Sequence, residues 1–384
     1  MTDPTAPLVS LCMIVRNEAG VLPRTLEAAR PWVDEIVVVD TGSEDATPEV
    51  ARAWGAAVEH VPWQDDFSAA RNASLARAAG DWILVLDADE VLQEGSGPRL
   101  RRACAEAPAE LAGWELKLRC PTTGDGGIVR LNWFVRLFRR RPGVRFEGRV
   151  HEQVIGSLAP HGRIERLEGV EILHTGYQRS PEALAAKARR NRRLLELHLA
   201  EEPDYAPAWF QLADTLALLG EPRAAIDAYR RALRLAGVSR LALPPGVVAI
   251  ALQNLGAALL AVGEREQGVL TLETALDADP TLVPARVHLA QLALGEGRPA
   301  TAARYLTEAL EVRGEAARGG EYELDPTLLQ ELLARARAAM GRLAGPRTAA
   351  AASGPPDGPG QPGAPRVTLN ASGRAGGGTP TLGA

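Results

Sequence analysis

The sequence predicts an α/β domain built on a parallel sheet, followed by an all-α stack of helical repeats. In residues 8–178, β-branched runs alternate with amphipathic stretches, whereas residues 181–343 are rich in Ala, Leu, Arg and Glu at helical spacing. A chain of 384 residues that is 46% hydrophobic has room for roughly two to three domains. Residues 345–384 are mostly Gly, Pro, Ala, Ser and Thr, so we expect a disordered tail there and a disordered N-terminus over residues 1–7.

Composition and charge exclude several classes of protein. The net charge of −5 provides no general attraction to nucleic acid or anionic lipid, so no nucleic-acid partner is expected. Apolar runs such as Ile36–Val39 are too short for a transmembrane segment, and Met1–Pro7 lacks a secretory signal. The cysteines, Cys12, Cys104 and Cys120, are odd in number and widely spaced, which excludes a disulfide framework. These features predict a cytoplasmic protein and leave a homo-oligomer open.

The first domain reads as alternating strands and helices. Four apolar runs are predicted strands: 8–15, 36–39, 56–61 and 82–86. Asn17 is expected to cap the first helix, which buries Leu22 and Leu26, and Pro48 suits the first turn of the second. A third helix is predicted over 67–79. Because ligands of such sheets bind outside the carboxyl ends of the strands, the polar residues after each strand are the candidates for a site.

The helical region contains an internal repeat of 34 residues. Small and large side chains recur at the same slots in three units, as in Trp209, Leu212, Ala213, Leu216, Ala225, Tyr229 and Ala232 and their counterparts in the second and third units. This pattern matches the tetratricopeptide (TPR) repeat, whose helix pairs stack into an array with a concave surface. We predict an insertion at about 238–247, a leading helix over 181–200 and a closing helix over 328–343.

A cluster of acids follows the fourth predicted strand. Asp87, Asp89 and Glu90 come directly after an apolar run, and such acids repel one another unless a cation lies among them. Carboxylate oxygens at this spacing suit Mg²⁺ or Mn²⁺ with open positions for a substrate diphosphate. The alternative is an acidic loop that caps the next helix.

Polar residues in three other segments lie at the ends of predicted strands or on a predicted helix. Asp40 ends the second strand, where an acid can accept hydrogen bonds from a base or a ribose hydroxyl, and a capped turn is the alternative. Residues 16–18 close the first strand, either lining a nucleotide pocket or capping a helix. Arg71 lies on the helix before the acidic cluster, either facing a phosphate or exposed to solvent.

Taken together, these motifs resemble glycosyltransferase family 2. The resemblance rests on the segments Cys-Met-Ile-Val-Arg-Asn-Glu (12–18), Val-Val-Val-Asp-Thr-Gly-Ser (37–43), Ala-Arg-Asn (70–72) and Leu-Asp-Ala-Asp-Glu (86–90). It implies a GT-A fold, in which a Rossmann-like mixed sheet lies in an α/β/α sandwich. Asp-Thr-Gly-Ser in place of Asp-Asp-Gly-Ser, with a helical repeat region, is similar to a bacterial subgroup that includes the sublancin S-glycosyltransferase and lipopolysaccharide-core glucosyltransferases.

The resemblance also implies roles for individual residues. The residues expected to bind a sugar nucleotide, most often a UDP-sugar, are Ile14, Arg16, Asn17, Glu18, Asp40, Arg71 and Asp87. Those expected to hold Mg²⁺ or Mn²⁺ are Asp87, Asp89 and His174. For His174, which stands beside apolar residues, a purely structural role is the alternative. The metal neutralises charge on the departing diphosphate. Family members of this kind are inverting hexosyltransferases, in which a carboxylate base deprotonates the acceptor.

The base is expected in the segment Arg-Phe-Glu-Gly-Arg-Val-His-Glu-Gln (145–153), which resembles a segment of the subgroup. Glu152 ranks above Glu147, with His151 as a neighbour; Glu90 and an ordinary salt-bridged pair remain alternatives. Adjacent side chains of an extended segment point to opposite faces, so His151 and Glu152 cannot both face the site on a regular strand.

The leading prediction is a metal-dependent inverting glycosyltransferase whose TPR array binds a protein or peptide acceptor or partner on its concave face, a saccharide acceptor being possible. One rival is a TPR scaffold with an inactive nucleotide-binding domain. A second is a nucleotidyltransferase, although residues 13–20 lack a Gly-rich phosphate loop. A cluster of arginines is best explained as a solvated surface, with contact to the diphosphate or to an anionic acceptor as the alternative. These are Arg136, Arg139, Arg140, Arg141, Arg145 and Arg149.

Overall fold

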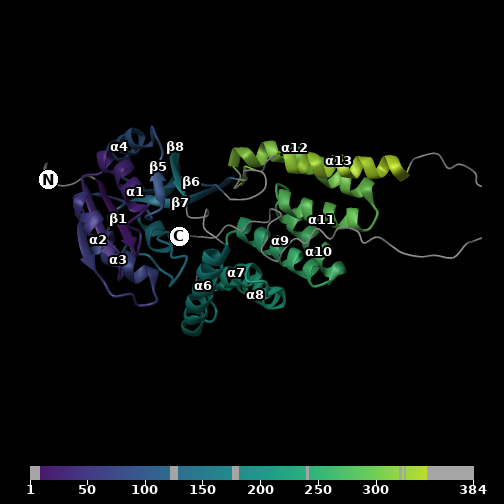
Figure 1. The fold of residues 1–384 in the computed structure, drawn as a ribbon, viewed down its shortest axis with the longest axis horizontal. Helices are drawn as coiled ribbons and strands as arrows, with labels where there is room; N and C mark the ends of the chain where they lie inside the picture. The colour runs from purple at the N-terminus through teal and green to yellow at the C-terminus, as the bar shows by residue number, and fades with distance from the viewer. Residues whose placement is uncertain are drawn as a thin grey trace, which may run out of the picture.

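The computed structural model describes residues 9–121, 129–174, 181–238, 242–319, 322–323 and 326–343. Figure 1 shows a sheet domain in purple and blue on one side and an array of helices in teal, green and yellow on the other. The two segments predicted to be disordered, 1–7 and 345–384, lie outside the described residues.

The sheet is mixed: one half is parallel, and the other half combines antiparallel pairs with one parallel pair. Its strands are β1 (Val9–Val15), β2 (Glu35–Asp40), β3 (Ala57–His60), β4 (Trp82–Val85), β5 (Glu90–Leu92), β6 (Leu111–Pro121), β7 (Val129–Arg139), β8 (Arg163–His174) and β9 (Tyr322–Glu323). The order is β3-β2-β1-β4-β7-β6-β8-β5, with β9 pairing to β7. Strands β1 to β4 pair in parallel, whereas β7 runs antiparallel to both β4 and β6. The four predicted strands and the mixed sheet are therefore confirmed.

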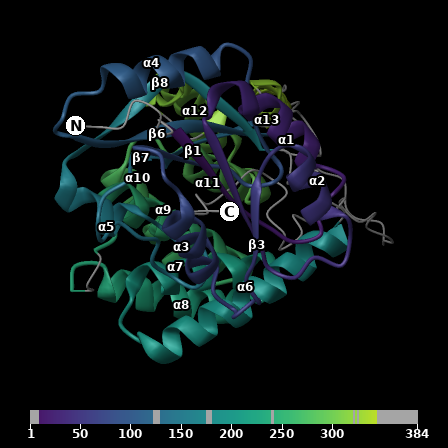
Figure 2. The ribbon, with the colours of Figure 1, turned by 90° about the vertical axis from the view of Figure 1, so that its left-hand side faces the viewer.

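Helices cover both faces of this sheet. They are α1 (Leu22–Ala29), α2 (Thr47–Ala53), α3 (Phe67–Arg77), α4 (Ser96–Glu106) and α5 (Ile155–Leu158). Alternate β1 residues enter different cores: Leu11 and Met13 pack with α1 and α4, whereas Cys12 packs with the α3 and α5 side. Because both faces are covered, β1, β2 and β4 are mostly buried and apolar, which is the pattern that the sequence showed, whereas β3 at the edge of the sheet is partly exposed. Figure 2 shows α3 and α4 on opposite sides of the strands.

The remaining helices form antiparallel pairs that stack side by side. They are α6 (Pro181–Glu201), α7 (Ala206–Leu218), α8 (Pro222–Leu235), α9 (Pro245–Ala261), α10 (Arg265–Ala278), α11 (Val283–Gly295), α12 (Pro299–Gly319) and α13 (Pro326–Leu343). Small residues permit close approach, as predicted: a Cβ added to Gly256 on α9 would lie 2.7 Å from Leu272 of α10. None of the helices within the described ranges combines the length and apolar character that a bilayer-crossing segment requires.

One predicted helix start is wrong. Asn17 does not cap the first helix, because α1 begins only at Leu22 and its N-cap position is Val21. Asn17 instead adopts a left-handed backbone conformation with φ of 56°, and its side-chain Oδ1 accepts the Glu44 N–H at 2.7 Å. The residue therefore ties the end of β1 to the loop after β2, which is a tertiary role that helix-capping statistics do not anticipate.

Candidate active site

Asp40 lies at the carboxyl end of β2, directly beside Val15 at the end of β1. The carboxylate is buried and accepts the backbone N–H groups of Gly42 at 3.3 Å and Ser43 at 3.2 Å, together with the Ser43 hydroxyl. Nδ1 of the exposed His60 ring lies 3.0 Å from Asp40 Oδ2. Burial alone would raise the pKa of Asp40, but these hydrogen bonds from Ser43, His60 and Gly42 lower it below its usual value.

The two loops beyond β1 and β2 are joined by hydrogen bonds. The Asn17 N–H donates to the Ser43 hydroxyl at 2.9 Å, and the Glu18 N–H donates to the Thr47 hydroxyl at 2.7 Å. Arg16 is exposed beside them, and Ile14 is partly buried on β1. The residues expected to line a nucleotide pocket thus lie along one rim of the sheet, at the position where ligands of parallel sheets bind.

The acidic cluster lies between β4 and β5, and buried arginines surround its first member. Arg71 Nη2 of α3 donates to Asp87 Oδ1 at 2.7 Å, and Arg136 Nη2 of β7 lies 3.4 Å from Asp87 Oδ2. Burial would raise the pKa of Asp87, but the charges of Arg71 and Arg136 hold that pKa well below its usual range. Asp87 is therefore a partly buried carboxylate, 15% exposed, that two arginines keep ionised.

Glu90 is fully buried behind Asp87. Its Oε1 accepts Arg136 Nη2 at 2.6 Å and its Oε2 accepts the Asp87 N–H at 3.0 Å. Burial raises the pKa of Glu90, and the charge of Asp87 adds to that effect, while Arg136 opposes it. Both carboxylate oxygens of Glu90 therefore bind groups inside the protein. Glu90 holds Arg136 and the Asp87 backbone in place and is poorly placed to contact a substrate.

Asp89 faces His174 rather than Asp87. Nε2 of His174, at the end of β8, lies 3.5 Å from Asp89 Oδ1, and Nδ1 lies 3.7 Å from the Cys120 sulfur. Burial lowers the pKa of His174, but the hydrogen bonds to Asp89 and Cys120 and the charges of Glu90 and Asp89 outweigh it and raise the pKa to about 11. The pair forms across the β5–β8 ladder, where Glu90 is opposite His174.

The residues in this corner fit a divalent cation that a substrate would complete. A carboxylate and an imidazole converge at Asp89 and His174, and each is a donor type that Mn²⁺ accepts once the metal has displaced the proton that Asp89 stabilises on His174. Within the described part of the chain, no group of three His, Cys, Asp or Glu side chains forms a ready-made metal cluster. Since Mg²⁺ and Mn²⁺ sites of this type use one or two carboxylates plus substrate phosphates, two protein donors are sufficient.

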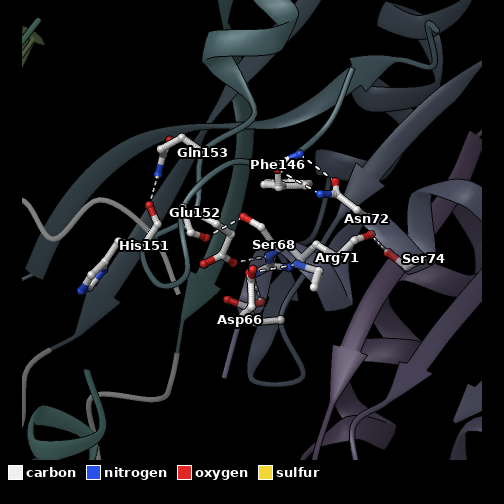
Figure 3. A network of polar contacts seen from close by, with 12 residues as sticks. Asp66, Ser68, Arg71, Asn72, Ser74, Phe146, His151, Glu152 and Gln153 are labelled. Carbon is white, nitrogen blue, oxygen red and sulfur yellow. Dashed lines mark hydrogen bonds and ion pairs between the residues drawn. The ribbon is translucent and has the colours of Figure 1, made fainter. Parts of the chain in front are cut away.

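Arg71 connects the acidic cluster to the segment in which the base is expected. The Arg71 side chain is buried, and its Nε donates to Glu152 Oε1 (Figure 3). Glu152 Oε2 is also buried and has no hydrogen-bond partner among the described residues. One oxygen of this carboxylate is therefore held in place by an arginine, while the other makes no hydrogen bond within the described residues.

The two other candidate base residues lie differently. In Figure 3 the His151 ring points away from Arg71, whereas Glu152 points toward it. His151 is buried and has a positive φ of 57°, so the chain turns sharply at this position. Glu147 is partly exposed and accepts Arg145 Nη2 at 2.6 Å.

Two residues that contribute to the site were not predicted as site residues from the sequence. Arg136 is not part of a solvated surface, because it is 5% exposed and bridges Asp87 and Glu90; that prediction is wrong for this residue. Asn72 forms two hydrogen bonds with the backbone of Phe146, at 3.0 Å and 2.8 Å, and so fixes the segment that leads to Glu152. The alternation along β7 placed Arg136 on one definite face, but only the sheet order shows that this face meets the acids.

Residues 10–145 match the family model described as glycosyl transferase family 2, and residues 206–237 match a tetratricopeptide repeat. Residues 10–145 are therefore similar to glycosyltransferase family 2. The match begins within β1 and includes Asp40, Arg71, Asp87 and Asp89, so all four lie in the matched part of the sheet domain. The repeat match covers α7 and α8, which confirms the first of the predicted units.

Among the curated relatives, one is named for its TPR repeats and another is named as a glycosyltransferase. The chain is 43% identical over 223 residues to TPR repeat-containing protein Synpcc7942_0270 of Synechococcus elongatus, covering 56% of this chain and 54% of the relative. It is 28% identical over 244 residues to the SPbeta prophage-derived glycosyltransferase SunS of Bacillus subtilis, covering 59% of this chain and 53% of the relative. Among solved structures, that of S. aureus TarS superposes with a TM-score of 0.38 at 15% identity, over 68% of this chain and 54% of that chain. The chain thus spans about half the length of these relatives.

Proposed function

We propose that the protein transfers a sugar from a nucleotide-diphosphate sugar, with a UDP-sugar as the expected donor, to an acceptor with inversion at the anomeric carbon. The observation that carries the proposal is the arrangement of Asp40, Asp87 and Asp89 at one edge of the sheet, with the buried Arg71 between the acids and Glu152. The match of this domain to glycosyl transferase family 2 supports the reaction type.

The rim formed by β1 and β2 would bind the nucleoside. Asp40 keeps a low pKa and so remains an acceptor at neutral pH, and His60 extends from it into solvent. Ile14, Arg16, Asn17 and Glu18 would form the adjoining wall. Because hydrogen bonds already hold the two loops together, little ordering is needed when a nucleotide binds.

Asp89 and His174 would hold Mn²⁺ or Mg²⁺, and Asp87 would contact the ribose or the metal. When bound, the metal would neutralise negative charge on the departing diphosphate. Arg71 and Arg136 keep Asp87 ionised and oriented, so that the carboxylate is in place before any substrate arrives.

Glu152 would act as the general base. Its Oε1 is held by Arg71, which orients the carboxylate and leaves Oε2 to take a proton from the acceptor. The acceptor is proposed to be a protein, peptide or saccharide. The stacked helix pairs offer the type of surface that binds polypeptide segments, which favours a protein or peptide.

The decisive experiment measures UDP release from a panel of UDP-sugars, together with calorimetric UDP binding, in the presence of Mn²⁺. We expect Asp89→Ala to abolish metal-dependent binding. Glu94→Ala, which removes an exposed acid five residues away, should behave as the wild type does. A wild-type protein that binds no sugar nucleotide with any divalent metal would contradict the proposal and favour the scaffold alternative.

A further inference from the structure

We infer that helix α6, the first helix of the array, belongs to the framework of the catalytic site and positions Glu152 through Arg149. This inference rests on the proposed function in one respect, because it takes Arg71 and Glu152 to be site residues. It concerns the segment 147–152, here called the base loop, which lies between the sheet domain and α6.

The start of α3 holds the base loop from the sheet-domain side. The Ser68 hydroxyl donates to the Gly148 carbonyl at 2.6 Å, and the Phe67 N–H donates to the Arg149 carbonyl at 2.8 Å. The loop also turns sharply, with positive φ at Gly148 (103°) and at His151 (57°). A path of this kind persists only where surrounding contacts determine it.

Helix α6 holds the same loop from the other side. Arg149 Nε donates to Glu201 Oε2 at 3.0 Å, and Nη2 pairs with the second oxygen of the same carboxylate. Arg149 Nη1 also donates to the Asp65 carbonyl at 3.3 Å. The Asp65 carboxylate in turn accepts both terminal nitrogens of Arg193 on α6, at 3.1 Å and 2.5 Å. Two bidentate arginine–carboxylate pairs therefore connect α6 to the sheet domain, and such pairs fix geometry as well as adding attraction.

Apolar packing joins the same surfaces. Val150 of the base loop is buried in one core with Leu194 and Leu195 of α6, and Phe67 packs against that core. The guanidinium of Arg190 on α6 lies 5.1 Å from the centre of the Phe67 ring. The base loop thus completes the core of the helical array, although it precedes that array by about thirty residues in the chain.

The consequence for the site follows from chain connectivity. Glu152 lies three residues beyond Arg149 and holds Arg71, which in turn holds Asp87. A shift of the base loop would move Glu152 Oε2 relative to the acceptor, and misplacement by about 1 Å costs a catalytic group up to about a hundredfold in rate. Arg149 is accordingly a positioning residue, and it acts from the boundary between the two parts of the molecule.

The test compares full-length Arg149→Glu with Arg192→Glu. Arg192 lies on α6 and pairs with glutamates as Arg149 does, but its partners are Glu196 of α6 itself and Glu221 of the helical array, each at 2.8 Å. We expect Arg149→Glu to speed amide exchange at Phe67 and in the base loop about tenfold or more, whereas Arg192→Glu leaves both at the wild-type rate. The kcat should fall about tenfold to a hundredfold, while KM for the sugar nucleotide changes less than about threefold.

Rescue separates positioning from general damage. Arg149→Lys should recover part of the kcat, and Arg149→Glu combined with Glu201→Arg should recover more than Arg149→Glu alone. Base-loop exchange equal in Arg149→Glu and Arg192→Glu would overturn the inference, and so would an unchanged kcat. If the wild type turns over no sugar nucleotide, the proposed function fails, and the exchange rates still decide whether α6 fixes the loop.

Discussion

Replacing Arg136 with methionine would remove the cation that compensates two buried acids. The Arg136 side chain is 6% exposed and that of its partner Glu90 is 0% exposed, so water cannot take over the lost interaction. Breaking a buried pair by removing one member costs about 3–5 kcal/mol, because the remaining charge stays desolvated. Asp87 retains Arg71, so most of this loss should arise at Glu90. We therefore expect Arg136→Met to lower the free energy of unfolding by about 3–5 kcal/mol at neutral pH.

The pH dependence of this loss has a definite sign. Burial already raises the pKa of Glu90, and removing Arg136 raises it further. An acid with a raised folded-state pKa destabilises the fold above its unfolded-state pKa, and that cost disappears as the pH falls. The deficit of Arg136→Met should thus be largest near about pH 8 and smaller near about pH 5.

Urea denaturation followed by tryptophan fluorescence measures the effect, because Trp82 and Trp114 stack in the core of the sheet domain. Adding Glu90→Gln to Arg136→Met should recover much of the lost stability. Arg163→Met is the matched control: it breaks an exposed pair with Glu110 and should cost about 1 kcal/mol or less. A deficit for Arg136→Met no larger than that of the control, or independent of pH, would refute the reasoning.

Three other substitutions test separate parts of the structure. Gly268→Val should destabilise the helical array by about 1–3 kcal/mol in thermal unfolding, because even a Cβ at this position lies 2.7 Å from Leu260; an unchanged Tm would contradict the close α9–α10 packing. Tyr229→Phe removes the hydroxyl that donates to the buried Asp214 at 2.5 Å and should cost about 1–3 kcal/mol in the same assay, whereas equal stability would mean that this bond contributes nothing. Asp40→Asn should weaken UDP binding and lower the free energy of unfolding at neutral pH. Since the pKa of Asp40 is lowered in the folded state, this stability deficit should vanish as the pH falls through that pKa. A stability deficit that persists in acid would show that the charge of Asp40 is not its cause.

Local sequence patterns were sufficient to predict much of the fold. The apolar runs of β1, β2 and β4 were recognisable because both faces of a parallel sheet are covered at these strands, whereas the edge strand β3 is partly exposed. The repeat slots predicted the close approach at Gly256 for the same kind of reason. Asp40 and Asp87 were found because acids at strand ends stand out against apolar neighbours. The cap assigned to Asn17 was wrong because a tertiary contact with Glu44 competes with local capping.

The pairings within the site belong to the tertiary structure alone. Arg71 and Glu152 are 81 residues apart in sequence, and Arg136 and Glu90 are 46 apart. No periodicity of a strand or helix connects residues at such separations. What brings Arg136 to the acids is the insertion of β7 next to β4, and what brings Glu152 to Arg71 is the sharp turn of the base loop against α3 and α6. The sequence thus determined which residue types stand at the ends of the strands. The sheet order and the contact with α6 decided which charges neutralise one another, because buried charges are stable only in pairs.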